Sequence, residues 1–151
     1  MAPLPLAFIK DIKQMKDEKF LVTIEKDSDG TFIAYNVDES PYTLIGRGAT
    51  VKEAKADFAN SMQEVKASEE EREGAAAPIL SAVPVFSFDL SSLFEYYSML
   101  NVSAFARYLG INETLMRQYK KGNTYISDVQ LQKIEDGLHR LGSDFLGLRL
   151  V

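Results

Sequence analysis

Residues 99–125, MLNVSAFARYLGINETLMRQYKKGNTY, decide how the second half of this chain folds. Ser103–Leu109 has the apolar spacing of a short helix, and Gly110 ends it because glycine readily adopts the left-handed conformation needed just past a helix end. Asn112 is a good N-cap, so we expect a second helix from Glu113 to about Lys121. The stretch therefore predicts two short helices joined by a tight turn.

Two further residues favour a particular kind of helix pair. Ala106 leaves room for two helices to cross closely, and Ile111 supplies an apolar plug for the turn. A purely structural helical hairpin shows the same periodicity, but it does not need the small residue, the glycine, the plug and the cap in this order. The order favours a helix-turn-helix, the unit that places its second helix in the major groove of DNA.

The second helix divides into an apolar stripe and a polar remainder. We expect the stripe to be buried, and it consists of Leu115, Met116 and Tyr119. The residues largely outside it are Arg117, Gln118, Lys120 and Lys121.

From Asn101 to about Gly142 the chain resembles the phage-repressor type of helix-turn-helix domain, in which further helices follow the recognition helix. The next helix is expected to begin after Ser127, which is its N-cap. Its expected apolar face consists of Leu131, Ile134 and Leu138.

This resemblance implies roles for individual side chains. The residues that match the base-reading positions of the family are Glu113, Thr114, Arg117 and Gln118. Asn123 and Thr124 match a loop that meets phosphate. Val102 replaces a polar residue that often touches phosphate in the family, so Asn101 and Ser103 are expected to supply that contact. The full set of candidate DNA-binding residues is Asn101, Ser103, Asn112, Glu113, Thr114, Arg117, Gln118, Lys120, Lys121, Asn123 and Thr124.

The first half of the chain has the alternation of a small sheet. Strands are expected over 20–26, 31–37 and 43–47. Asp29-Gly30 lies between the first two and is a strong hairpin signal, because both residues can adopt a positive φ. Three strands are therefore expected before the first long helix.

That helix is introduced by glycines and a capping box. Gly46 and Gly48 are expected to bring the backbone close to a neighbour or to make a bend. Thr50 caps the helix and Glu53 reaches back to its start. The helix is expected to end near Ser68, with apolar positions at Val51, Ala54, Phe58, Met62 and Val65.

The rest of the first half is expected to be a linker and one more strand. The glutamate-rich residues 69–74 and the run of alanines before Pro78 indicate a frayed helix end and a linker, and residues 84–88 indicate a last strand. The resulting order is β-β-β-α-β, followed by an all-α region. The predicted fold class is α+β.

This order, together with KDSDGTFIAYNV (26–37) and GRGATVKEAKADFANSMQEV (46–65), resembles the HicB antitoxin family. Residues 48–54, GATVKEA, match the family's Gly-x-Thr-x-x-Glu-Ala pattern. The resemblance covers residues 19–150. It implies a partial RNase H-like domain over 19–90 and a helix-turn-helix domain over 91–151, with 1–18 as an N-terminal extension.

The same resemblance implies a function and partners. A HicB-like chain would be the antitoxin of a type II toxin-antitoxin system, neutralising a small basic HicA-type mRNA interferase and repressing its own operon. Helix-turn-helix domains of this kind bind palindromic operators as dimers, so a homodimer or homotetramer is expected. No catalytic role and no cofactor are expected.

The amino-acid composition excludes several classes of protein. The 151 residues include no cysteine and a single histidine, His139, which excludes disulfides and thiol nucleophiles and makes a structural zinc site improbable. There is no apolar run near the roughly 20 residues of a membrane helix, and the start is a poor signal peptide. A cytoplasmic protein without a membrane partner is expected.

Met15 is a candidate native start, and otherwise residues 1–14 are expected to form a loosely held extension.

Charge is shared unevenly between the two halves. Residues 1–90 hold 10 lysines and arginines against 16 aspartates and glutamates, whereas residues 91–151 hold 7 against 6. The acidic half therefore suits a basic protein partner.

Two rival interpretations remain open. The chain could be a stand-alone regulator without a toxin, or a metal-dependent nuclease that uses Asp27, Asp29 and Asp38. Aspartates in a hairpin turn are already favoured for backbone reasons, which weakens the nuclease interpretation. The apolar residues 145–151, FLGLRLV, are expected to pack into the core or to add to a dimer interface.

Overall fold

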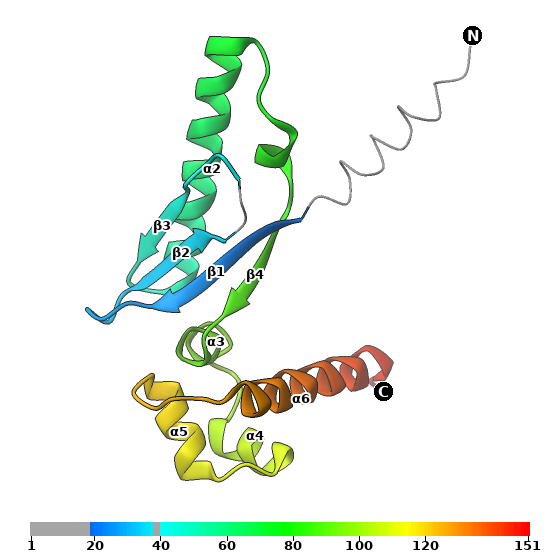
Figure 1. Cartoon of the computed structure of the whole chain (residues 1–151). Helices are drawn as coiled ribbons and strands as arrows, with labels where there is room; N and C mark the ends of the chain where they lie inside the picture. The colour runs from blue at the N-terminus through cyan, green and yellow to red at the C-terminus, as the bar shows by residue number, and fades with distance from the viewer. Residues whose placement is uncertain (1–18, 38–39) are drawn as a thin grey trace. The chain divides into compact units, whose positions relative to one another are not determined.

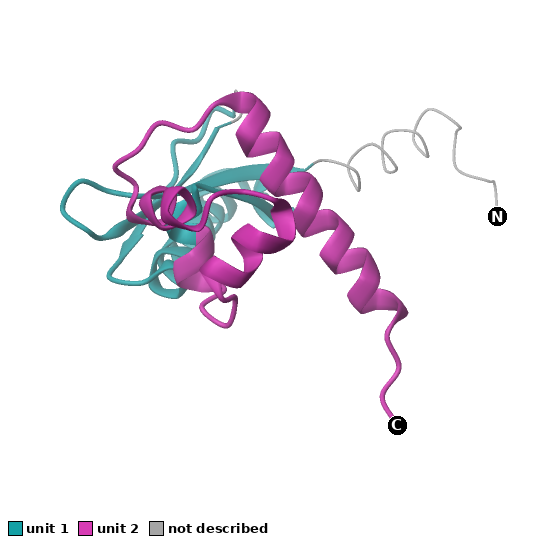
Figure 2. Ribbon diagram, turned by 90° about the horizontal axis from the view of Figure 1, so that it is seen from below, with its two compact units in different colours: residues 1–92 teal, residues 93–151 magenta. Residues whose placement is uncertain are grey.

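The structure is a computed structural model that describes residues 19–37 and 40–151 (Figure 1). It divides into two compact units, unit 1 (residues 1–92) and unit 2 (residues 93–151), which Figure 2 shows in different colours. The described residues form a four-stranded mixed sheet and five α-helices, so the α+β class is confirmed. The expectations for residues 1–18 and for Asp38 lie outside the described residues.

Unit 1 is built on its sheet. The four strands are β1 (Phe20–Lys26), β2 (Phe32–Asn36), β3 (Ile45–Gly48) and β4 (Pro84–Phe88). They lie in the order β3-β2-β1-β4. Both β1–β2 and β2–β3 are antiparallel, whereas β1 and β4 are parallel, with Phe20 opposite Pro84. The predicted order β-β-β-α-β is confirmed, and β1 is interior to the sheet.

The β1–β2 hairpin turns at the predicted dipeptide, although only its glycine has a positive φ. Gly30 has φ 86°, and among the described residues only glycines have positive φ, so Asp29 does not use the left-handed conformation open to it. The Asp29 carboxylate instead accepts the Thr31 backbone N–H at 2.9 Å and its hydroxyl at 2.6 Å. The aspartate therefore holds the turn through its side chain.

The long helix α2 (Val51–Glu73) begins as predicted. Thr50 is its N-cap, and the Thr50 hydroxyl accepts the Glu53 N–H at 3.1 Å. The Glu53 carboxylate in turn accepts the Ala49 N–H at 2.8 Å. The side chains of residues 50 and 53 thus pair with backbone donors at the helix start, which is the physical content of the predicted capping box.

The end of α2 lies later than predicted. The helix continues to Glu73 and is capped by Gly74, which has φ 81°, so the expected frayed end over 69–74 was wrong. Glu69 explains the extra turn, because its carboxylate accepts both the Tyr42 hydroxyl and the Ala77 N–H. The expected linker also contains a 3₁₀ helix, η1 (Pro78–Ser81), whose Leu80 is buried.

Helix α2 lies across one face of the sheet (Figure 1). A Cβ added at Gly46 would lie 2.2 Å from the Phe58 nitrogen, and one at Gly48 would lie 2.6 Å from the Ala54 nitrogen. The predicted close approach is therefore between the backbones of β3 and α2. The fully buried apolar side chains of this unit are Phe20, Val22, Ile24, Ala34, Val51, Ala54 and Phe58. On the opposite face of the sheet, Leu21, Ile45 and Val85 are exposed.

Unit 2 is helical. Its elements are α3 (Leu90–Tyr96), which begins just before the unit boundary, α4 (Val102–Leu109), α5 (Glu113–Lys121) and α6 (Asp128–Gly147). The buried apolar side chains that hold it together are Phe94, Phe105, Ala106, Leu109, Ile111, Met116, Tyr119 and Ile134.

The helix α6 matches its predicted start but not its whole predicted face. The Ser127 hydroxyl caps it by accepting the Gln130 N–H at 3.2 Å. Ile134 is buried, whereas Leu131 is 43% exposed, so that part of the expected face was wrong. Gly137 is buried instead, and a Cβ there would meet the Leu109 side chain at 1.9 Å. The apolar pattern of the sequence could not predict this contact, because glycine has no side chain and does not count as an apolar position.

The last turns of α6 and the tail after it are exposed. Leu146 is 91% exposed and Leu150 is 96% exposed, so packing of residues 145–151 into the core was the wrong alternative. A helix of 20 residues is about 30 Å long, whereas α4 and α5 have 8 and 9 residues, so α6 extends beyond what they can cover. Within the described part of the chain, each helix is too short or too polar to cross a membrane.

Candidate nucleic-acid interface

The turn between α4 and α5 has every feature that the sequence predicted for it. Asn101 caps α4 by accepting the Ala104 N–H at 2.9 Å, and Gly110 ends that helix with φ 70°. The Ile111 N–H donates to the Ala106 carbonyl at 2.9 Å, and Asn112 caps α5 by accepting the Leu115 N–H at 3.1 Å. The caps fix where each helix begins and therefore which side chains α5 presents.

The two helices are held together by a small buried core. Ala106 is fully buried and Ile111 is nearly so, as expected for a close crossing and an apolar plug. Met116 and Tyr119 of α5 are buried, and Leu115 is half-buried. One face of α5 is thereby committed to packing and the other is left outside.

The outer side of α5 consists of polar and basic side chains. Thr114, Arg117, Gln118, Lys120 and Lys121 are all exposed, as predicted. Lys120 and Lys121 also lie in the last turn of the helix, where positive charge is favourable beside the carbonyl end of the helix dipole. Their position is therefore favourable for α5 itself as well as for an anionic ligand.

Arg117 is held by two other side chains. Its Nη1 donates to the Ser103 hydroxyl at 2.8 Å, and its Nη2 donates to the Thr114 hydroxyl at 3.2 Å. Ser103 belongs to α4 and Thr114 to α5, so the guanidinium lies across both helices. Ser103, which the sequence suggested as a phosphate contact, contacts Arg117 here.

Glu113 also contacts a residue of the other helix. Its carboxylate forms an ion pair with the Arg107 guanidinium of α4. Glu113 lies in the first turn of α5, where a negative charge is favourable beside the free N–H groups. In this arrangement the side chain that the resemblance assigned to base reading ties α5 to α4.

The loop after α5 is short and polar. Gly122 ends α5 with φ 80°, Asn123 is exposed and Thr124 is half-buried, beside the last turn that holds Lys120 and Lys121. The candidate phosphate residues at this end of α5 are therefore neighbours along the chain and accessible.

Sequence reasoning missed two residues of this surface. Arg107 was not singled out, because its partner Glu113 lies across the turn and no helical spacing joins the two. Tyr125 is 86% exposed and directly follows the polar loop. An aromatic residue beside a Gly-Asn-Thr loop was the available signal for Tyr125.

Asp27 and Asp29, the described candidates for a metal-dependent nuclease site, both form hydrogen bonds within or beside the β1–β2 turn. The Ser28 backbone N–H and then the Arg47 guanidinium lower the pKa of Asp27, and the Thr31 hydroxyl and backbone N–H lower the pKa of Asp29. Arg47 and Asp27 form an ion pair at 2.9 Å. Among the described residues, which do not include Asp38, no three acidic, histidine or cysteine side chains gather as metal ligands would.

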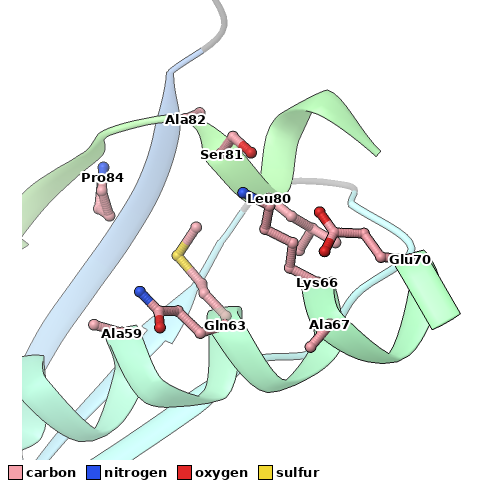
Figure 3. Close-up of a pocket in the computed structure, with 10 residues that line it drawn as sticks. Ala59, Gln63, Lys66, Ala67, Glu70, Leu80, Ser81, Ala82 and Pro84 are labelled. Atoms are coloured by element: carbon pink, nitrogen blue, oxygen red, sulfur yellow. The ribbon is translucent and has the colours of Figure 1, made fainter. Parts of the chain in front are cut away.

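Unit 1 also has a shallow groove between α2 and η1, with a volume of about 580 Å³ (Figure 3). Gln63, Lys66 and Glu70 line it from α2, and Leu80 and Ser81 line it from η1. The lining combines one cation, one carboxylate and apolar atoms, which does not select a chemical class of ligand.

Comparison of the chain with protein families, with curated proteins and with solved structures gave no match. A functional assignment therefore depends on the residues and their geometry.

Proposed function

We propose that this chain is a DNA-binding regulator in which α4 and α5 form a helix-turn-helix and α5 is the recognition helix. The proposal rests on one observation: two capped helices cross at a buried alanine, and the second presents Thr114, Arg117 and Gln118 to solvent. A short helix with one buried face and a polar, basic outer face is the arrangement that enters a major groove.

The distribution of charge supports this assignment. Arg117, Lys120 and Lys121 lie on α5, and Asn123 and Thr124 follow it. Phosphate contacts from lysines and from a polar loop would fix the register on DNA, while side chains on the helix face would read bases. In this proposal Asn101 and Asn112 act as caps and Glu113 acts as a tie between helices.

We further propose that the whole chain is an antitoxin that represses its own operon. The support is the HicB-like motif order in unit 1, a resemblance that also implies an RNase H-like architecture for its sheet and α2. Residues 1–90 are acidic, with 10 cationic side chains against 16 anionic ones, which suits a small basic RNA-cleaving toxin. The exposed Leu21, Ile45 and Val85 of the sheet face add apolar area for a protein contact.

Several parts of the proposal concern assembly and location. A single recognition helix reads too few base pairs for useful affinity, so a homodimer or homotetramer is proposed, with the exposed tail 145–151 contributing to self-association. The proposed location is the cytoplasm, where operator DNA and an mRNA-cleaving toxin both occur. Unit 1 is proposed to act by covering the toxin, without chemistry of its own.

Binding to DNA is tested directly with the full chain. The purified protein is titrated against DNA from upstream of its own gene and against a scrambled duplex, at several salt concentrations. Arg117→Ala should cost about 1–3 kcal/mol on the upstream DNA only, and Lys121→Ala should weaken both duplexes and flatten the salt dependence by about one unit. Lys52→Ala, an exposed lysine of α2, is the matched control. Equal binding by wild type and the Arg117/Lys121 double variant would defeat the DNA-reading assignment.

The antitoxin role is tested by co-expression. The first step is to look for a short reading frame of a basic protein beside this gene, which the antitoxin role requires. Cells producing that protein should recover growth when the full chain is supplied. Persistent toxicity despite accumulation of the full chain would favour the stand-alone regulator. Cleavage of RNA by the purified chain in magnesium, abolished by Asp27→Asn with Asp29→Asn, would favour the nuclease.

A further inference from the structure

Arg117 is exposed, yet two hydroxyl groups hold its guanidinium. One hydroxyl belongs to Ser103, the second residue of α4, and the other belongs to Thr114, the second residue of α5. Each accepts one N–H from a different terminal nitrogen of Arg117, at 2.8 Å and 3.2 Å. A long exposed side chain with two fixed partners on separate helices has few remaining rotamers.

The remaining donors of that guanidinium determine what it can bind. A guanidinium has five N–H groups, so the two hydroxyls leave three for a ligand. A planar fork of this kind matches a pair of acceptors, and in the major groove guanine alone offers two acceptors side by side, O6 and N7. The hydroxyls are neutral, so they orient the arginine without pairing its charge.

We propose that Ser103 and Thr114 are positioning residues that aim Arg117 at one guanine of the DNA site. This inference rests on the proposed DNA-binding function and adds the base that is read and the residues that determine specificity. Ser103 acts through Arg117 and not as a phosphate contact. The orienting hydroxyls reduce the conformational freedom that Arg117 would otherwise lose on binding.

The first part of the experiment finds the site. The full chain selects duplexes from a random-sequence DNA library, and each position of the selected site is then substituted in turn. Arg117→Ala should abolish the preference at one G·C pair, a loss of roughly 5- to 150-fold in discrimination. Failure of the wild type to select any sequence would overturn both the proposed function and this inference.

The second part tests the positioning residues at that pair. Ser103→Ala and Thr114→Val should each reduce the preference for guanine there by about 2- to 10-fold, the effect of one lost hydrogen bond. In Ser103→Ala, the affinity for duplexes in which this pair is already replaced should stay within about twofold. Ser103→Thr keeps the hydroxyl and should restore the preference, and Ser143→Ala, an exposed hydroxyl of α6, is the control.

A double-variant cycle separates positioning from a structural effect. In the Arg117→Ala background, Ser103→Ala should have no further effect on discrimination, because the side chain that it orients is absent. Uniform weakening on every duplex would make Ser103 a phosphate contact and overturn the inference while leaving the DNA-binding function intact. Unchanged discrimination in both hydroxyl variants, with the wild type selective, would also overturn the inference alone.

Discussion

Unit 1 and unit 2 are each stabilised internally by a different kind of contact. In unit 1, the backbones of β3 and α2 meet at Gly46 and Gly48, and the central contact joins Phe20 to Phe58 with ring centroids 5.9 Å apart. In unit 2, the caps Asn101, Asn112 and Ser127 fix where α4, α5 and α6 begin. Unit 1 therefore depends on close backbone approach between segments distant in sequence, whereas in unit 2 the positions of the helices are determined by caps beside them in sequence, over a buried apolar core.

The largest effect is expected from Gly46→Ala. The added Cβ would lie 2.2 Å from the Phe58 nitrogen and 2.4 Å from the Ala54 carbonyl oxygen, and these backbone atoms cannot move aside without shifting α2. The expected loss of stability is roughly 1–3 kcal/mol or more. Native-state amide hydrogen exchange of the full chain should show reduced protection in unit 1 only.

The control for that variant is Gly142→Ala, because a Cβ at this exposed helical position would meet nothing within 4 Å. In Gly142→Ala the amides of α6 should keep their protection from hydrogen exchange, since alanine is favoured over glycine inside a helix by about 1 kcal/mol. Loss of protection throughout both units in Gly46→Ala would contradict the separation drawn between them.

A loss of about 1 kcal/mol is expected from Asn112→Ala, because the Leu115 N–H would lose its side-chain acceptor. The same exchange measurement should show the loss in α4 and α5, while the amides of β1 and α2 keep their protection. Asn112→Asp keeps a capping oxygen and should retain most of the stability. Equal losses in Asn112→Ala and Asn112→Asp would show that the cap is not what fixes α5.

A smaller effect is expected from Gly137→Ala, which is the counterpart of Gly46→Ala in unit 2. Here the added Cβ would meet Leu109 Cδ2 at 1.9 Å, the far end of a flexible side chain. The gain in helix propensity offsets part of the repacking, so the net loss should be about 1 kcal/mol or less. If amide protection fell further in Gly137→Ala than in Gly46→Ala, a clash with a flexible side chain would not be milder than a clash with backbone, and the prediction would be wrong.

The smallest effect concerns pH and the last turn of α2. The Tyr42 hydroxyl and then the Ala77 N–H lower the pKa of Glu69. A lowered carboxyl pKa contributes stability above the pKa of the unfolded chain, and this contribution is lost as pH falls through the folded pKa. Tyr42→Phe should therefore raise the pKa of Glu69 and weaken the acid dependence of α2.

An NMR titration of the Glu69 side-chain carboxyl would measure that shift, with Tyr125→Phe, an exposed tyrosine of unit 2, as the matched control. An unchanged Glu69 pKa in Tyr42→Phe would show that the phenol is not the cause.

The sequence predicted what is local and missed what is not. The predicted caps at Thr50, Asn112 and Ser127 follow from residue type and spacing alone, because a cap bonds two or three residues along the chain. The length of α2 was wrong because Glu69 depends on Tyr42, which is far away in sequence.

The candidate DNA surface shows the same limit. Exposure of Thr114, Arg117 and Lys121 follows from helical periodicity, and the structure agrees. The contact of Arg117 with Ser103, and that of Glu113 with Arg107, cross the turn between helices, so no periodicity within either helix reveals them.

The parallel pairing of β1 with β4 has a consequence for the order in which the chain folds. Phe20 pairs with Pro84, so β1 lacks one of its two neighbours until synthesis has passed α2 and η1. Non-local pairing of this kind slows folding, whereas the short-range contacts of helices such as α4 and α5 form quickly. During synthesis, the β1–β2 hairpin and α2 must therefore wait for β4 with one strand edge unpaired, and an unpaired edge is a site for wrong association. Unit 1, which is synthesised before unit 2, is thus completed only when a strand distant in its own sequence has been made.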